Sequence, residues 1–307
     1  MLSKSVCLKF YHTDLTRKPI FAKVKTLRNF SNSNPVIRPI KWWVAARYYD
    51  ALLKKFIDNP AKHEIRVVGM RRTGNHAILQ WVISLMDGHC FFCNDLPKDS
   101  PLSKAPIRTF EKGAGAERYL LCTYEDQSPQ NIFNSTAEEG MTLAGPSATQ
   151  TDLLFIRDPF NLFASRFVWK DPQGEAFRTD QNYRDHVVQL WKDVAKEYLD
   201  GESPAHRKRV NINYNQWFRD EAYRRDLAAQ MGLTYRAGQR EKVPEHGGGS
   251  SFEAQDKDGS GSKLKVLERW KNVAHEADYR AIFQDKELIE LSEKIFGHLP
   301  DTEQLWS

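Results

Sequence analysis

Apolar stretches of strand length alternate with segments of helical periodicity between residues 64 and 232. Continuous apolar runs bounded by polar residues are typical of buried strands, whereas apolar residues that recur every turn indicate helices. The pattern predicts strands at 64–70, 118–126, 151–156 and 209–217, and helices at 75–86, 159–169, 185–199 and 219–232. Strands that alternate with helices favour an α/β fold of three layers, with a central, mostly parallel sheet flanked by helices.

The same pattern divides the chain into two parts. Residues 1–60 form an N-terminal basic extension that ends in an amphipathic helix, "WWVAARYYDALLKKFI" (42–57). We expect the aromatic side chains of this helix to pack on the remainder of the protein. Residues 61–307 form the α/β domain, within which the Gly- and Ser-rich segment 246–263 is expected to be a mobile loop.

Composition narrows the function classes. Of the 307 residues, 40% are hydrophobic and 12% aromatic, which suits a packed globular enzyme. The formal net charge of +5 fits an anionic ligand, but it is not the dense basic face of a dedicated nucleic-acid binder, so we expect no nucleic-acid partner. No stretch approaches the ~18 apolar residues of a membrane span.

The N-terminal segment is strongly basic. The first 30 residues contain a single acid, Asp14, and seven basic residues: Lys4, Lys9, Arg17, Lys18, Lys23, Lys25 and Arg28. This composition is typical of an organelle transit peptide and equally of a basic surface arm. We expect a cytoplasmic protein, with organelle targeting as the alternative.

Two cysteines form a C-x-x-C pattern at Cys90 and Cys93. Zinc sites of this type need a second pair of ligands, and the sequence has no second C-x-x-C. The surrounding "HCFFCNDL" is apolar and strand-like, so structural burial is favoured over metal or redox chemistry.

A glycine-containing loop joins the first predicted strand to the first predicted helix. The spacing Gly69-x-x-x-x-Gly74 is that of a phosphate-binding loop, and Arg71, Arg72 and Thr73 lie within it. Backbone N–H groups of such a loop and of the following helix bind phosphate oxygens. Asn75 and His76 occupy the positions where a nucleotide hydrolase has Lys and Ser/Thr, the residue that ligates Mg²⁺. The loop therefore predicts a P-loop-like domain that binds phosphate without a metal.

The segment "GMRRTGNHAI" (69–78) resembles the 5′-phosphosulfate loop of the sulfotransferases, whose pattern is roughly Pro-Lys-Ser-Gly-Thr-Thr-Trp. Arg72 falls on the family's lysine, Thr73 on its serine and Gly74 on its glycine. Asn75 and His76 fall on the two threonines. The resemblance implies that the cofactor is 3′-phosphoadenosine 5′-phosphosulfate (PAPS), which needs no metal, and that these residues and Arg71 bind it.

Further segments continue this resemblance in the order that the family has them. "IRDPFNLFASR" supplies an arginine at a strand end and a serine eight residues later, Arg157 and Ser165, as in the family's 3′-phosphate site. Tyr214 in "INYNQWF" falls on the tyrosine near the adenine. "ERWKN" (268–272) resembles the segment after the family's basic loop, which adds Arg269, Trp270 and Lys271 to the expected cofactor-binding residues.

The implied reaction is transfer of a sulfuryl group from PAPS to an acceptor hydroxyl or amine. The polar segment 171–186, "DPQGEAFRTDQNYRDH", favours a glycan or another small hydroxylated acceptor. Two alternatives stay open: a P-loop nucleotide kinase or NTPase, and a non-catalytic nucleotide-binding protein of the same fold. The sequence leaves the oligomeric state open.

Three residues are candidates for catalysis. Arg72 would stabilise the charge that develops on the departing phosphate. Glu125, at the end of the strand "RYLLCTYED", is the first candidate for the base that removes the acceptor's proton. Asp126 and His76 are the alternatives, and His76 could instead donate to the sulfuryl group. Successive strand residues face opposite ways, so only one of Glu125 and Asp126 can point at the site.

Overall fold

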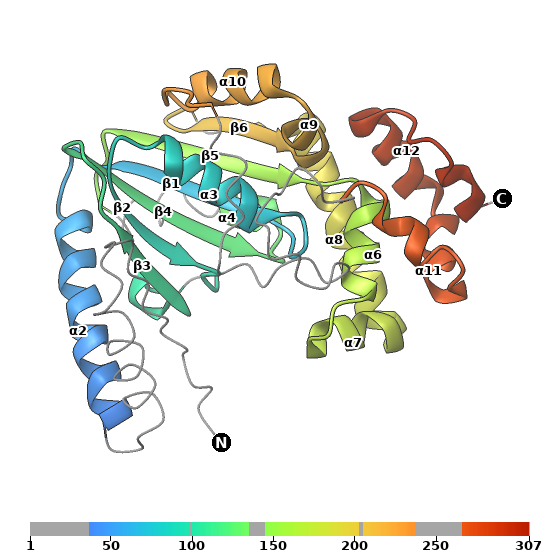
Figure 1. Ribbon diagram of the computed structural model, residues 1–307, viewed down its shortest axis with the longest axis horizontal. Coiled ribbons are helices and arrows are strands. Elements are labelled where there is room, and N and C mark those ends of the chain that lie inside the picture. The colour runs from blue at the N-terminus through green and yellow to red at the C-terminus, as the bar shows by residue number, and fades with distance from the viewer. Residues whose placement is uncertain (1–36, 99, 135–144, 203–204, 238–265, 307) are drawn as a thin grey trace, which may run out of the picture.

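The centre of the protein is a six-stranded sheet. The computed structural model describes residues 37–98, 100–134, 145–202, 205–237 and 266–306 (Figure 1). The predicted loop at 246–263 and the basic residues 1–36 lie outside the described residues. The strands are β1 (His63–Gly69), β2 (Gly88–Asn94), β3 (Ile107–Glu111), β4 (Glu117–Glu125), β5 (Thr149–Ile156) and β6 (Lys208–Asn213). Their order is β3-β2-β4-β1-β5-β6.

All neighbouring strands are parallel except β2 and β3, which are antiparallel. The predicted α/β class with a mostly parallel sheet is confirmed. The short edge strand β3 was not predicted. Its five residues follow a turn and continue the sheet beyond β2, so they have no place in the regular strand–helix alternation.

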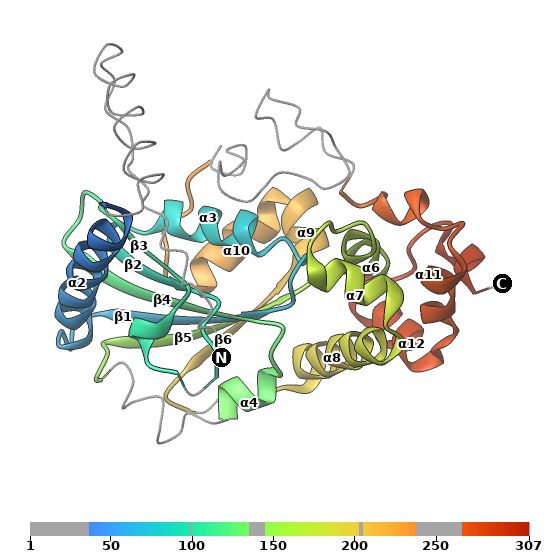
Figure 2. The same cartoon turned by 90° about the horizontal axis from the view of Figure 1, so that it is seen from below.

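Helices cover both faces of the sheet (Figures 1 and 2). One core cluster joins the sheet to α3 (Asn75–Leu85), α9 (Tyr214–Arg219) and α10 (Glu221–Gln230). The other joins it to α2 (Ile37–Ile57), α4 (Pro129–Asn134) and α8 (Gln181–Asp200). Beyond the carboxyl ends of the strands lie α6 (Pro159–Phe167), α7 (Pro172–Thr179), α11 (Ala277–Ala281) and α12 (Lys286–Phe296). The expected three layers are present.

Local sequence signals explain the helix boundaries near the sheet. Asp158 caps α6 by accepting a hydrogen bond from the Asn161 N–H, and Pro159 follows it in the first turn. Asn213 caps α9 by accepting from two backbone N–H groups. The prediction of a strand over 209–217 is therefore wrong after Asn213, because this cap starts a helix at Tyr214. No helix among the described residues is long and apolar enough to cross a membrane.

The cysteines of the C-x-x-C pattern face opposite sides of the sheet. Cys90 belongs to one core cluster and Cys93 to the other, because positions three apart on a strand have opposite orientations. Both are buried, and burial raises the pKa of the Cys90 thiol. Cys93 pairs in register with the buried Cys122 of β4. The two thiols of the pattern cannot bind one metal ion together in this arrangement.

A buried ion network crosses the middle of the sheet. The guanidinium of Arg66 on β1 donates through Nε and Nη2 to the two carboxylate oxygens of Asp152 on β5, each at 2.8 Å. Arg207 donates to Asp152 at 2.9 Å and to Glu64 at 2.9 Å. Each charge in the network is paired, as burial requires. The network fixes β1 against β5 and the start of β6.

Helix α2 packs on the sheet through one side only. Tyr49, Leu53 and Phe56 are buried, and the Phe56 ring lies 5.7 Å from that of Phe91 on β2. Trp43 and Tyr48 are exposed. The expectation that the aromatic side chains of this helix pack on the protein is thus confirmed for Tyr49 and Phe56 and wrong for Trp43 and Tyr48, because these point away from the sheet.

The packing predicts that α2 contributes to the stability of the whole domain. Phe56→Ala should lower the free energy of unfolding by about 3–5 kcal/mol, because it opens a cavity between α2 and the sheet. Tyr48→Ala, on the exposed side of the same helix, should change it by less than about 0.5 kcal/mol. Urea denaturation measures both. Wild-type stability in Phe56→Ala would show that α2 lies outside the cooperative core.

Candidate functional site

Polar residues gather at the carboxyl ends of the three central strands. Gly69, the last residue of β1, pairs in register with Glu125 on β4 and with Phe155 on β5. The loop 70–74, the pair Glu125-Asp126 and Arg157 therefore leave the sheet side by side. This edge of a parallel sheet is where α/β proteins bind ligands.

The loop 70–74 is held in a tight turn. The Thr73 N–H donates to the Met70 carbonyl at 3.1 Å, and Arg72 and Gly74 both have positive φ, 73° and 100°. The Tyr214 ring closes over Gly74 so tightly that an added Cβ would lie 2.2 Å from its Cε2. Position 74 therefore requires glycine both for its backbone conformation and for the approach of Tyr214.

The loop presents hydrogen-bond donors that the described residues leave without an acceptor. The backbone N–H groups of Gly74, Asn75 and His76, at the start of α3, have no hydrogen-bond partner in the part of the chain that the structure describes. The buried Thr73 hydroxyl has none either. The first turn of α3 contains no acidic residue. A helix start with free N–H groups is a favourable place for an anion.

Arg72 lies in a group of basic side chains, the arginine cluster, formed by Arg72, Arg157 and Arg269. Arg72 Nε donates to the Ser165 hydroxyl at 3.1 Å, and Arg269 Nη1 donates to the same oxygen at 3.4 Å. Burial, and then the like charges of Arg157 and Arg166, lower the pKa of Arg72 to about 10. The pKa of a guanidinium falls only where its surroundings disfavour the positive charge. An anion bound beside Arg72 would offset this unfavourable interaction.

Arg157 supports the loop 70–74 through a hydrogen bond to its backbone. Its Nη1 donates to the Arg72 carbonyl at 3.0 Å, Nη2 donates to the Val266 carbonyl, and its guanidinium lies 4.9 Å from the centre of the Tyr214 ring. Its Nε is buried without a partner. Arg157 and Ser165 are 1% and 0% exposed. The structure brings these two predicted residues together around Arg72, since each forms a hydrogen bond with it.

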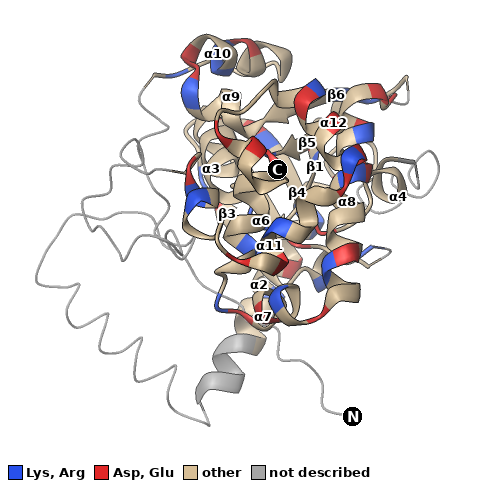
Figure 3. Ribbon diagram, turned by 90° about the vertical axis from the view of Figure 1, so that its right-hand side faces the viewer, with Lys and Arg blue, Asp and Glu red and all other residues tan. Residues whose placement is uncertain are grey.

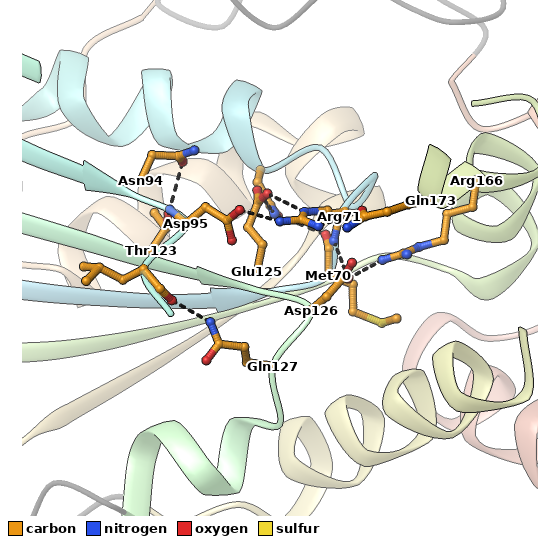
Figure 4. A network of polar contacts seen from close by, with 12 residues as sticks. Met70, Arg71, Asn94, Asp95, Thr123, Glu125, Asp126, Gln127, Arg166 and Gln173 are labelled. Carbon is orange, nitrogen blue, oxygen red and sulfur yellow. Dashed lines mark hydrogen bonds and ion pairs between the residues drawn. The ribbon is translucent and has the colours of Figure 1, made fainter. Parts of the chain in front are cut away.

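The neighbouring Arg71 contacts acidic side chains instead (Figure 4). It forms ion pairs with Asp95 at the end of β2 and with Glu125, and Nη1 donates to Gln173 on α7 at 2.6 Å. Burial lowers the pKa of Arg71, but attraction by Asp95, Asp126 and Glu125 outweighs burial and raises it overall. We call Asp95, Glu125 and Asp126 the carboxylate cluster. Consecutive arginines thus occupy opposite electrostatic environments.

The side chains of Glu125 and Asp126 have different hydrogen-bond partners. The Glu125 carboxylate accepts from Asn75 Nδ2 at 2.8 Å through Oε1 and from Arg71 Nε at 3.4 Å through Oε2. Asp126, with a φ of 54°, turns away and accepts from the Arg71 N–H at 2.9 Å and from the buried Arg166. Glu125 therefore contacts Arg71 of the loop 70–74 and Asn75 at the start of α3, whereas Asp126 links the loop to α6.

Three further predicted residues that the structure describes, His76, Trp270 and Lys271, form no hydrogen bond or ion pair with the arginine cluster through their side chains. His76 is exposed on the first turn of α3, with no polar side-chain contact among the described residues. Trp270 is buried in the core. Its backbone N–H and that of Arg269 both donate to Oδ1 of the Asn161 side chain, at 3.4 and 2.8 Å. Lys271 points away from the arginine cluster and pairs with Asp301 at 3.3 Å.

Sequence reasoning missed several residues of the site: Asp95, Asn161, Arg166, Trp169 and Gln173. The Arg72 guanidinium lies over the Trp169 ring, with its carbon 5.4 Å from the centre of that ring. Asp95 could have been found, because it directly follows a predicted buried strand and so had to lie at the same sheet edge. The others depend on how α6 and α7 fold back over the loop, which no local pattern indicates.

Comparisons with known proteins add little at the sequence level. No protein-family model matches the chain, and a search of the curated proteins finds no match. Among solved structures, the chain is similar to mouse sulfotransferase SULT7A1 in a crystal structure complexed with PAP. The two chains are 12% identical, the alignment covers 80% of this chain and 94% of that one, and the TM-score is 0.43. A similarity of this size does not define a function, so the assignment below rests on the site.

The opposite environments of the two arginines predict opposite responses to anions. Pyrophosphate at about 100 times its dissociation constant should raise the free energy of unfolding by about 2.7 kcal/mol at constant ionic strength. Arg72→Met should remove most of this increase, whereas Arg71→Met should retain it, because the charge of Arg71 is already balanced by carboxylates. Denaturation with and without pyrophosphate measures the difference. Loss of the increase in Arg71→Met alone would place the anion on the other arginine.

Proposed function

We propose that the protein is a sulfotransferase that takes a sulfuryl group from PAPS and transfers it to an acceptor hydroxyl or amine. The observation that carries the proposal is the division of the site into an arginine cluster and a carboxylate cluster, separated by the loop 70–74. A donor with a 5′-phosphosulfate and a 3′-phosphate, both negatively charged, suits the first, and proton removal from an acceptor suits the second. The sequence resemblance of segments 69–78 and 157–165 to sulfotransferase motifs supports the same assignment.

The donor would be held by two groups of residues. The free N–H groups of the loop, with Arg72 and Thr73, suit its 5′-phosphosulfate. Arg157, Ser165 and Arg269 suit its 3′-phosphate, because guanidinium groups bind phosphate with strong, charge-assisted hydrogen bonds. The unpartnered Nε of Arg157 and hydroxyl of Thr73 fit this role. PAPS supplies an activated sulfuryl group whose leaving group is a phosphate.

The absence of a metal ligand in the loop distinguishes this proposal from a P-loop kinase or NTPase. Asn75 occupies the position of the P-loop lysine, and its Nδ2 donates to the Met70 carbonyl and to Glu125. His76 occupies the next position, where those enzymes have the Mg²⁺-binding hydroxyl, and an imidazole supplies no hydroxyl. Positive charge from Arg72 would take the place of the metal in stabilising the departing phosphate. We therefore propose that cofactor binding requires no metal.

Glu125 is the proposed catalytic base. Asn75 fixes Oε1 at 2.8 Å, whereas the contact of Oε2 with Arg71 is longer, at 3.4 Å, so Oε2 is the oxygen that would accept the proton of the acceptor. Arg71 acts as a positioning residue that holds Glu125 between β2 and α7. As the acceptor oxygen attacks sulfur, its proton passes to Glu125 and the sulfur–oxygen bond to the phosphate breaks.

The acceptor is proposed to be a glycan or a similar hydroxylated molecule. Gln173 of the polar segment 171–186 contacts Arg71, so this segment, as α7 and the start of α8, borders the carboxylate cluster. Carboxylate and amide groups accept hydrogen bonds from sugar hydroxyls. A direct comparison of sugars with phenols and amines as acceptors tests this choice.

Arg269 is expected to provide selectivity for the 3′-phosphate. Isothermal titration with EDTA present should show tighter binding of adenosine 3′,5′-bisphosphate than of 5′-AMP. Arg269→Met should reduce this preference by about 10- to 100-fold, the typical effect of losing a hydrogen bond to a charged group. Lys271→Met is the matched control, since its side chain points to Asp301. An unchanged preference in Arg269→Met, or binding that requires Mg²⁺, would contradict the donor assignment.

Glu125 and Arg71 are expected to affect transfer rather than donor binding. With the donor saturating, Glu125→Gln should lower the single-turnover rate by about 10²–10⁴-fold, and Arg71→Met by about 10²-fold through misplacement of the base. The affinity for adenosine 3′,5′-bisphosphate should stay near that of the wild type in both. Asp126→Asn and His76→Ala test the two alternatives. Normal transfer by Glu125→Gln would exclude it as the base.

A further inference from the structure

Helix α2 exposes an apolar face that nothing in the proposed reaction uses. Trp43, Val44 and Tyr48 are 62%, 54% and 55% exposed. They account for three of the four exposed large hydrophobic side chains among the described residues, and the fourth, Leu199, is 38% exposed on α8. Spacings of one, four and five residues place the three on one side of the helix. We call this side the outer face of α2.

The outer face also carries positive charge. Arg47 lies over the Trp43 ring, 5.5 Å from its centre, and Lys54 and Lys55 are exposed one to two turns further along. The only acid in α2 is Asp50, which pairs with Arg108 on the sheet side. On the opposite end of the molecule, Lys and Arg residues lie among Asp and Glu residues across α7, α8, α11 and α12 (Figure 3).

The sequence that leads into α2 has the same charge. The first 30 residues contain seven basic residues and one acid. The charge of this segment adds to that of Arg47, Lys54 and Lys55 on α2. A negatively charged partner is favoured, and a second copy of the chain would bring like charges together.

We propose that the outer face of α2 docks on an anionic phospholipid bilayer. Tryptophan and tyrosine suit the headgroup level of a membrane, because each combines a large apolar ring with a polar group. Lysine and arginine add attraction to anionic headgroups, which acts within a Debye length of the surface. The protein would lie on the membrane as a peripheral protein, with α2 parallel to its plane.

The position of α2 is compatible with an active enzyme at the surface. In both views of the ribbon, α2 lies at one end of the molecule, whereas α6, α7 and α12 lie at the other (Figures 1 and 2). The candidate site is at the carboxyl ends of the strands, next to α6 and α7. Docking through α2 would leave this site facing away from the bilayer.

Flotation of the full chain with vesicles tests the proposal. The wild type should bind phosphatidylcholine vesicles that contain phosphatidylserine, and bind pure phosphatidylcholine vesicles much less. The double variant Trp43→Ser/Tyr48→Ser should reduce the partition coefficient for anionic vesicles by about tenfold or more. Lys54→Glu/Lys55→Glu should reduce it at low salt and less at high salt.

Leu199→Ser is the matched control, because within the described part of the chain it removes the one exposed large hydrophobic residue outside α2, and it should bind vesicles as the wild type does. Circular dichroism confirms that each variant is folded. Equal binding of the wild type and the Trp43/Tyr48 variant would overturn the proposal, as would binding that ignores phosphatidylserine. A dimer that the Trp43/Tyr48 substitutions dissociate would overturn it in favour of a second copy.

Discussion

The crowding of positive charge around Arg72 is the constraint on which the candidate site depends. Its guanidinium is partly buried and lies near Arg157 and Arg166, and these surroundings lower its pKa to about 10. Positive charges gathered in this way attract an anion, and a bound anion would reduce the repulsion between them. The loop adds a backbone cost, since Arg72 adopts a positive φ that a non-glycine residue rarely has. Both features are typical of a binding site rather than of a structural turn.

The rest of the site follows from how this loop is held. Asp126 accepts from the Arg71 N–H and from Arg166, and so ties the loop to α6. Arg157 donates to the Arg72 carbonyl and fixes the other side. With the backbone fixed at both residues, the Arg72 side chain contacts Ser165 in the arginine cluster, and the Arg71 side chain contacts Asp95 and Glu125 in the carboxylate cluster. Figure 4 shows the second set of contacts. One loop thereby separates the proposed donor and acceptor sides of the reaction.

The sequence predicted most of the helices and strands around the site. It predicted the contacts between side chains of different strands and loops less well. Periodicity identified α3, because Ile78, Trp81, Val82 and Leu85 repeat at helical spacing, and the structure buries all four. It could not identify the partners of Arg71, because Asp95 reaches Arg71 only through the strand order β2-β4-β1, which no local pattern encodes. The direction of Lys271 was likewise hidden, since it depends on the position of Asp301, thirty residues later.

The sequence also left Glu125 and Asp126 as competing candidates for the base. Strand alternation predicted that only one of the two side chains could face the site, but it did not identify which one. The structure distinguishes them through Asp126's positive φ, which turns this side chain toward Arg166, and through the contact of Glu125 with Asn75 at the start of α3. The distinction is a matter of backbone conformation at a strand end.

A crystal structure of the chain with adenosine 3′,5′-bisphosphate is the most direct test of the central claim. The account predicts that the 5′-phosphate binds the N–H groups of Gly74 and Asn75 and the guanidinium of Arg72, while Arg71 keeps its contacts with Asp95 and Glu125. A 5′-phosphate bound to Arg71, or a nucleotide bound away from the loop 70–74, would contradict it.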